Sequence, residues 1–249
     1  LDGGRPLGGE ESFTLATRPG EDLVLVTRLH PVNVGQFDVY IGDTRIATRV
    51  IPQLPGGWLE VPTLIPAEYI DSTQTRVRIV PGAHYQPYHH WAYQGHYTPD
   101  RLPETPLTRF QDGAIVLAAA DLQLHGDQLA VTLRWATDGS ANGDYKIFVH
   151  VLDAADRIAA QADSRPGRDA LPPGNWLMGS FQDVFALNLS DAPSGRYTVA
   201  IGLYDPYDLV TFERLTPAGG DDQRRFIIGE FMIDQSESAD NAAGLNADG

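Results

Sequence analysis

The amino-acid sequence predicts an all-β protein made of two tandem β-sandwich domains of the jelly-roll or immunoglobulin-like kind. Three observations lead to this prediction. Short runs of alternating apolar and polar residues recur throughout the 249 residues, and turn signals rich in Gly, Pro, Asn and Asp separate them about every 8–12 residues. No window longer than about ten residues carries a helical stripe. The hydrophobic fraction of 42% is that of a folded protein.

The first domain is predicted over residues 1–100. Its expected strands are rich in β-branched and aromatic residues and end at turn signals such as Pro19-Gly20 and Gly42-Asp43. A single turn of helix is expected over 67–71, after Pro66. The expected strands are 12–17, 23–29, 36–41, 44–48, 58–62 and 75–80.

A segment without periodicity follows the last of these strands. Residues 81–108 contain five prolines, which predicts a long loop or linker. We place the linker itself at 101–112, between the two domains.

The second domain is predicted over residues 113–234, where the β pattern resumes. Its expected strands are 114–118, 129–135, 145–152, 158–161, 183–189, 197–204 and 225–231. A polar tail, 235–249, has Leu245 as its one large apolar residue. This tail is expected to be disordered unless a partner orders it.

Charge and composition exclude several classes of protein. The chain has 33 acidic and 18 basic residues, a formal net charge of −15, which argues against a nucleic-acid partner because phosphates require a basic face. Nine basic and 12 acidic residues lie in 1–109, against nine and 21 in 110–249. The chain has no cysteine, so disulfides, thiol nucleophiles and cysteine-ligated metals are excluded. No apolar run approaches the ~20 residues of a transmembrane helix. The first residue is Leu1, which suggests a processed chain or a piece of a longer protein.

The richest local composition lies in residues 84–97, where four of the seven histidines occur among tyrosines and a tryptophan. Three interpretations remain open. The aromatics wedge between the two domains, or their flat faces form a platform for sugars, or the imidazoles bind a metal. The adjacent His89 and His90 would point to opposite faces of a strand, which weighs against the metal. The candidate ligand-binding residues here are Tyr85, Tyr88, His89, His90, Trp91 and Tyr93.

Catalytic motifs are missing from the sequence. It contains no nucleophile elbow, phosphate-binding loop, zinc-protease motif or dinucleotide fingerprint, so no catalytic residue and no cofactor is predicted. Asp-rich loops of β-sandwiches can supply oxygen ligands to calcium. The loop with Asp138, Asn142 and Asp144 is the candidate for a structural calcium ion, although it lacks the spacing of a known calcium loop.

The second half carries a recognisable combination of motifs: Phe148-Val149-His150-Val151-Leu152-Asp153, Asp163-Ser164-Arg165-Pro166, Pro172-Pro173-Gly174-Asn175-Trp176 and Pro193-Ser194-Gly195-Arg196-Tyr197. Residues of about 120–232 resemble the C-terminal β-sandwich domain of bacterial membrane glycosyltransferases of the dolichyl-phosphate-mannose transferase-like class. That resemblance implies a non-catalytic, extracytoplasmic accessory role at the periplasm or cell surface, associated with a membrane protein. His150 is expected to be a core or interface residue that is satisfied by a hydrogen bond; the alternative is that it acts as a ligand. Trp176 either plugs the end of the sandwich or forms an exposed stacking surface.

The sequence therefore predicts a non-catalytic, extracytoplasmic accessory or binding module of the cell envelope, with a glycan as a candidate ligand. The alternative is a structural subunit of a surface layer, filament or membrane complex, whose partners would be other protein subunits. A glycan-active enzyme is the third hypothesis. The sequence names neither the glycan nor the partner nor the oligomeric state.

Overall fold

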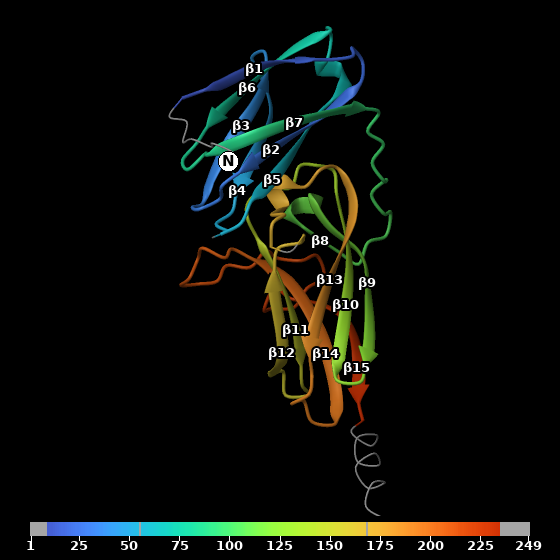
Figure 1. Ribbon diagram of the computed structural model, residues 1–249. Coiled ribbons are helices and arrows are strands. Elements are labelled where there is room, and N and C mark those ends of the chain that lie inside the picture. The colour runs from blue at the N-terminus through green and yellow to red at the C-terminus, as the bar shows by residue number, and fades with distance from the viewer. Residues whose placement is uncertain (1–8, 55, 168, 235–249) are drawn as a thin grey trace, which may run out of the picture.

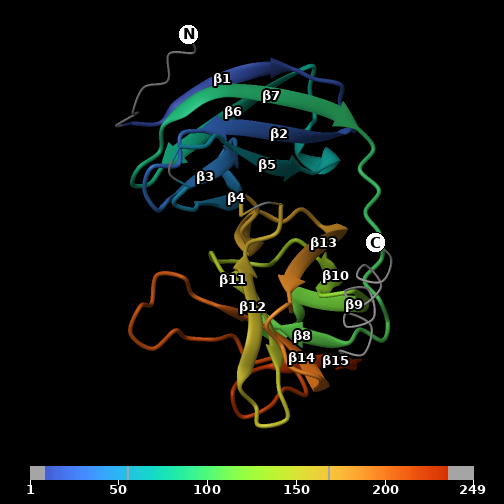
Figure 2. The same ribbon diagram turned by 60° about the horizontal axis from the view of Figure 1, so that its bottom comes forward.

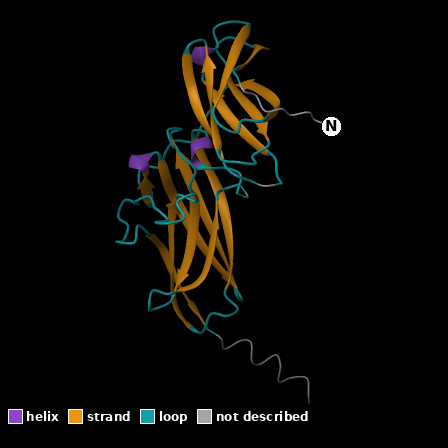
Figure 3. Ribbon diagram, turned by 90° about the vertical axis from the view of Figure 1, so that its left-hand side faces the viewer, coloured by secondary structure: helices purple, strands orange, loops and turns teal. Residues whose placement is uncertain are grey.

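The computed structural model describes residues 9–54, 56–167 and 169–234. They form two β-sandwich domains, as predicted, which lie end to end (Figure 1). A view from the side shows strands throughout both domains, with only short helical turns between them (Figure 3). No helix in the described part of the chain is long and apolar enough to cross a membrane. The polar tail 235–249 lies outside the described residues.

The first domain packs a four-stranded sheet of order β1-β6-β3-β4 against a three-stranded sheet of order β5-β2-β7. All pairs are antiparallel. The elements are β1 (Glu11–Ala16), β2 (Asp22–Leu29), β3 (Gly35–Ile41), β4 (Thr44–Ile51), β5 (Leu59–Ile65), the 3₁₀ turn η1 (Ala67–Tyr69), β6 (Gln74–Pro81) and β7 (Pro87–Gly95).

Strand β2 shows how the alternating pattern builds this domain. Leu23, Leu25 and Leu29 point inward and are fully buried, while Val24, Val26 and Arg28 occupy the outward positions in between. Phe37 and Val39 of β3, together with inward residues of β5 and β6, complete the core. The side chains at the outward positions therefore determine the chemistry of the outer face of the β5-β2-β7 sheet.

The second domain has two four-stranded sheets of order β13-β10-β9-β8 and β12-β11-β14-β15. The elements are β8 (Thr108–Phe110), the turn η2 (Gln111–Gly113), β9 (Ile115–His125), β10 (Gln128–Thr137), β11 (Lys146–Leu152), β12 (Ile158–Ser164), the turn η3 (Pro173–Asn175), β13 (Gly179–Asn188), β14 (Gly195–Tyr204) and β15 (Phe226–Ile233).

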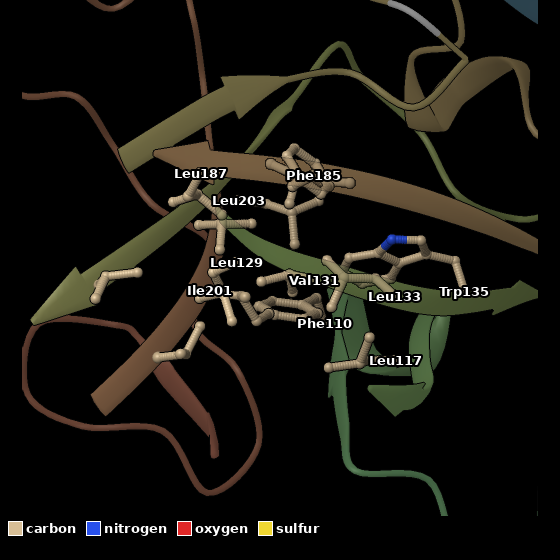
Figure 4. Close-up of a cluster of buried hydrophobic side chains, with 14 of the residues drawn as sticks. Phe110, Leu117, Leu129, Val131, Leu133, Trp135, Phe185, Leu187, Ile201 and Leu203 are labelled. Carbon is tan, nitrogen blue, oxygen red and sulfur yellow. The ribbon is translucent and has the colours of Figure 1, made fainter. Parts of the chain in front are cut away.

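The core of the second domain lies between its two sheets (Figure 4). Leu129, Val131 and Leu133 of β10 face Ile201 and Leu203 of β14 in this cluster. Two tryptophans close the end nearest the first domain: the ring centroids of Trp135 and Trp176 are 5.9 Å apart, and the indole N–H of Trp176 donates to the carbonyl oxygen of Leu171 at 3.0 Å.

The structure corrects the prediction of a long loop over residues 81–108. Residues 87–95 form strand β7, whose register pairs Trp91 with Val26 and Tyr93 with Val24. Pro87 is tolerated because β7 is an edge strand and because the pairing is irregular at its start, between Arg28 and Leu29. Aromatic side chains favour strands, and here that preference prevails over the proline and glycine content. The connection between the domains begins only after Gly95.

The two domains meet where η3 packs against β4 (Figure 2). The side-chain amide of Asn175 pairs with the backbone of Val50: its Oδ1 accepts from the Val50 N–H and its Nδ2 donates to the Val50 carbonyl, both at 2.8 Å. A Cβ atom at Gly174 would lie 2.6 Å from Cγ2 of Val50, so a larger residue does not fit. The hydroxyl of Tyr97, in the connecting segment, donates to the Met178 carbonyl at 2.6 Å.

Candidate functional site

The outer face of the β5-β2-β7 sheet carries a group of aromatic side chains. The register places His89, Trp91 and Tyr93 at outward positions of β7, opposite Arg28, Val26 and Val24 of β2. Two more rings stand at one end of this face, Trp58 just before β5 and Tyr88 at the irregular start of β7. We call Trp58, Tyr88, His89, Trp91 and Tyr93 the aromatic platform.

Ring contacts join four members of the platform in two pairs. The ring of Trp58 lies edge-on to that of Tyr88, with centroids 4.5 Å apart. The rings of His89 and Trp91 are 4.5 Å apart. Trp58 is 50% exposed and Tyr93 61%, so large flat apolar surfaces are open to solvent on a rigid sheet. Single exposed hydrophobic residues are ordinary on a protein surface, whereas several exposed rings on one face make that face a candidate binding surface.

Arg28 lies between the two tryptophans of the platform. Its guanidinium carbon is 4.7 Å from the ring centroid of Trp91 and 5.7 Å from that of Trp58. The guanidinium donates to Glu60 Oε1, with Nη2 at 2.5 Å. This stacking fixes the tryptophan rings, and the ion pair places a cation and a carboxylate side by side on the same face. The surface therefore combines apolar ring faces with hydrogen-bonding groups and has little net charge.

A cavity of about 240 Å³ adjoins one end of the platform. His30 belongs to both: it lines the cavity, and its ring centroid lies 6.1 Å from that of Trp58. Gln86, also in the lining, donates from Nε2 to the Tyr88 hydroxyl at 3.2 Å. Asn33 and His84 add further polar groups to the wall. The platform thus leads into a small polar recess.

Two of the candidate residues in this segment lie on the inner side of the sheet. Tyr85 is only 2% exposed and donates its hydroxyl to Glu11 Oε2 at 2.9 Å; burial, together with the nearby carboxylate, raises the pKa of Tyr85. The ring nitrogens of His90 lie 3.1 Å from Thr27 Oγ1 and 3.1 Å from Glu11 Oε2. Neither side chain belongs to the outer face that carries the platform, although Tyr85 also lines the adjoining cavity.

The interpretations left open by the sequence can now be compared with the geometry. The aromatic segment does not form a wedge between the domains, because it is a strand of the first domain. His89 and His90 point to opposite faces, and the described residues contain no group of three His, Asp or Glu side chains arranged to hold a metal. The rings on the outer face of β7 keep the platform as the candidate binding surface. Sequence reasoning missed Trp58 and Arg28, which join it through sheet pairing and not through proximity in the chain.

Trp176 does not form an exposed stacking surface, since it is 2% exposed within the core of the second domain. The calcium candidates bond to other protein groups, and the structural calcium ion stays a prediction from the sequence. Asp138 Oδ1 accepts from the N–H of Ser140 at 2.8 Å, and the backbone of Asn142 bonds to Gln111. The carboxylate of Asp144 forms a buried ion pair with Arg165, whose Nη2 lies 2.8 Å from Asp144 Oδ2.

No protein-family model matches the chain, and no curated protein is similar enough to count as a relative. Several solved structures are similar. A glycosyl hydrolase family 2 member from Bacteroides cellulosilyticus is 10% identical, over 91% of this chain and 28% of that one, with a TM-score of 0.27. A β-glucuronidase from Ruminococcus gnavus in complex with uronic deoxynojirimycin is 12% identical, over 90% of this chain and 35% of that one, also at 0.27.

Bacteroides uniformis β-glucuronidase 2, covalently bound to cyclophellitol-6-carboxylate aziridine, is 10% identical, over 84% of this chain and 26% of that one, with a TM-score of 0.27. The chain thus spans about a quarter to a third of the length of these structures. Similarity at this level carries no argument about ligand or activity. The resemblance to a glycosyltransferase-associated domain and the extracytoplasmic location stay predictions from the sequence.

Proposed function

We propose that the chain is a non-catalytic carbohydrate-binding accessory module, and that the aromatic platform with its adjoining recess is the glycan-binding surface. The observation that supports this most directly is the alignment of Trp91 and Tyr93 on one outward face of β7, beside Trp58. Pyranose rings present C–H groups on their flat faces and hydroxyls at their edges. Flat apolar rings flanked by the Arg28–Glu60 pair and His89 match both features.

The first experiment measures binding of the whole chain to a glycan array and to insoluble polysaccharides. Replacing Trp91 or Trp58 by Ala is expected to weaken glycan binding by at least about tenfold, because each removes a stacking surface. The thermal stability of Trp58→Ala should change little, since Trp58 is 50% exposed.

Tyr40→Ala is the matched control for this experiment. Tyr40 lies on the outer face of the opposite sheet of the same domain, under Arg78, whose guanidinium carbon is 4.3 Å from the ring centroid. It repeats the ring-and-arginine pair away from the platform, so its loss should leave glycan binding unchanged. If no glycan binds the wild-type chain, or if Tyr40→Ala weakens binding as much as Trp91→Ala, the platform is not a glycan site.

A second candidate function, an assembly subunit, is favoured by one observation on the second domain. Leu209 and Val210, at the tip of the connection between β14 and β15, are 72% and 89% exposed. Asp208 holds this tip in shape by accepting from the backbone of Val210 and Thr211. If the tip mediates self-association, light scattering will show oligomers that Leu209→Ser with Val210→Ser disperses. A monomer at all concentrations would leave only the binding module.

A further inference from the structure

A second cavity lies on the outer face of the β12-β11-β14-β15 sheet, in the other domain. Phe148 and His150 occupy outward positions of β11, yet they are only 2% and 7% exposed. Opposite them on β14 stand Gly202 and Ala200, and opposite them on β12 stand Asp163 and Gln161. Because the two β14 positions carry almost no side chain, the sheet is hollowed at this point.

Gly202 determines the shape of this hollow. A Cβ atom there would lie 2.4 Å from Cζ of Phe148 and 2.6 Å from its Cε1, so the phenylalanine ring lies directly over the glycine. Arg214, from the connection between β14 and β15, stacks on the same ring with its guanidinium carbon 4.4 Å from the centroid. The cavity measures about 270 Å³, and Tyr204, Phe212 and Ile158 form its apolar walls.

His150 provides the main indication of a ligand. No hydrogen bond to its imidazole is formed by any residue that the structure describes, although the side chain is buried, and its nitrogens are not sealed inside the protein. Burial, Arg214 and Arg225 lower the pKa of His150 to about 4, so at neutral pH the ring is uncharged, with one donor and one acceptor. Because the nitrogens open into the cavity, they can bond to water or to a ligand that enters it. The imidazole is therefore set to bond to something in the cavity.

The charges around the cavity indicate the ligand's chemistry. Asp163 and Arg214 both line it and act electrostatically on each other, and Lys146 also acts on Asp163. The formal charges of Asp163 and Arg214 cancel. His150, Gln161 and Tyr204 add neutral donors and acceptors, so five polar side chains surround a small space with aromatic walls. A ring with several hydroxyls uses that many bonds, whereas a zwitterion such as an amino acid offers only two charged ends.

We propose that this cavity binds a single pyranose ring of a neutral sugar. The carboxylate of Asp163 accepts from neighbouring hydroxyls, Arg214 and Gln161 donate to ring or hydroxyl oxygens, and His150 bonds to a further hydroxyl. The volume lies at the lower end of the about 300–1,000 Å³ found for drug-sized ligands, which limits the occupant to one ring. This site is independent of the aromatic platform, because it lies on the other domain and involves none of the same residues.

The test follows the imidazole NMR signals of His150, assigned by their loss in His150→Phe, while the whole chain is titrated with sugars. The probes are methyl β-D-glucopyranoside, methyl β-D-galactopyranoside, methyl α-D-mannopyranoside and N-acetylglucosamine, with phenylalanine as the zwitterion. We expect a saturable shift with at least one sugar. Asp163→Asn should weaken that binding about tenfold through the lost charge-assisted hydrogen bonds.

Two further variants make the test specific. Gly202→Ala, which forces the Phe148 ring out of place, should also weaken sugar binding at least about tenfold. Asp121→Asn, an exposed carboxylate on β9 that bonds to Gln123, should bind like the wild type, and so should Trp91→Ala. The proposal is overturned if no sugar shifts the His150 signals, if binding survives Asp163→Asn and Gly202→Ala, or if phenylalanine saturates the site instead. None of these results would bear on the platform.

Discussion

The interior strands β2 and β11 occupy comparable places in the two domains, but the outer face of β2 is open to solvent whereas that of β11 is buried. In β2 burial alternates, so that every second residue faces solvent. In β11 every residue from Ile147 to Leu152 is buried. Both strands pack an inward apolar row against a facing sheet. The difference arises outside the sandwich: β2 is left uncovered, and the outer face of β11 is covered by the connection between β14 and β15.

A cluster of polar side chains anchors that connection at its base. Arg165 forms a two-pronged ion pair with Asp144, and the Tyr207 hydroxyl donates to Asp144 Oδ2 at 2.6 Å. The same hydroxyl accepts from Arg165 Nη2 at 3.1 Å and from the Gln53 N–H of the first domain at 3.2 Å. Burial and the bond to Asp144 raise the pKa of Tyr207 to about 12. The connection between β14 and β15, which we call the cover of β11, is thus bonded to its own domain and to the neighbouring one.

The comparison shows that one architecture supports two kinds of surface. An open outer face with rings at outward positions makes a flat platform, as on β2 and β7. A covered face with glycine and alanine on the neighbouring strand makes a cavity, as beside β11. The sandwich supplies the scaffold, and the loops together with the outward residues determine what can bind.

The largest effect on stability is expected from breaking the ion pair between Asp144 and Arg165, which holds the cover in place. Asp144→Asn leaves the guanidinium of Arg165, whose side chain is 2% exposed, without its main countercharge. An uncompensated buried charge costs about 3–5 kcal/mol of unfolding free energy. We expect about 3 kcal/mol, because Asp169 remains as a weaker partner at 3.1 Å. Urea denaturation monitored by tryptophan fluorescence measures it.

Glu60→Gln is the matched control, because it breaks the Arg28–Glu60 pair on the uncovered face of β2 and β5. Solvent-exposed pairs are worth less than about 1 kcal/mol, so this variant should unfold almost like the wild type. Equal losses in the two variants would show that the Asp144–Arg165 pair is no more important than a surface pair, and that the connection is not held in the way described.

The alternating pattern was sufficient to predict the all-β fold, because burial on one face of a strand leaves a period of two in the sequence. It was insufficient for β7, which lies in a proline-rich segment that suggested a loop, while its aromatic residues pair with β2. The inward direction of His90 and the outward direction of Trp91 depend on the register of β7, and register is set by the partner strand. For that reason the sequence grouped these residues together where the structure separates them.

Contacts between distant parts of the chain were beyond sequence reasoning. Asp144 resembled a calcium ligand in its loop, but its partner Arg165 follows a different strand. Arg28 carries no motif, and it joins the platform only because β2 lies between β5 and β7. His150 was expected to be a core or interface residue. The structure shows why the alternation of Phe148, His150 and Leu152 does not lead into the core: this row faces outward and is buried by a loop.

A smaller effect, which depends on pH, should distinguish the covered face from the open one. His150 has its pKa lowered to about 4, by burial first and then by Arg214 and Arg225, against about 6.5 in an unfolded chain. The imidazole of His150 therefore takes up a proton near pH 6.5 in the unfolded state but only near pH 4 in the folded state. The unfolding free energy consequently falls as the pH drops through this window, and the contribution is fully present only above about pH 6.5.

Between pH 7 and pH 5 we expect His150 to account for a loss of about 1–2 kcal/mol, allowing for screening by water at the cavity mouth. His150→Phe keeps an apolar ring on the sheet and removes the titration, so its unfolding free energy should fall by that much less over the same interval. His89→Phe makes the same substitution at an exposed position on the open face of β7, so it controls for the general effect of replacing a histidine by phenylalanine. Parallel pH curves for the wild type and His150→Phe would mean that water reaches this imidazole freely, and that the face of β11 is as open as that of β2.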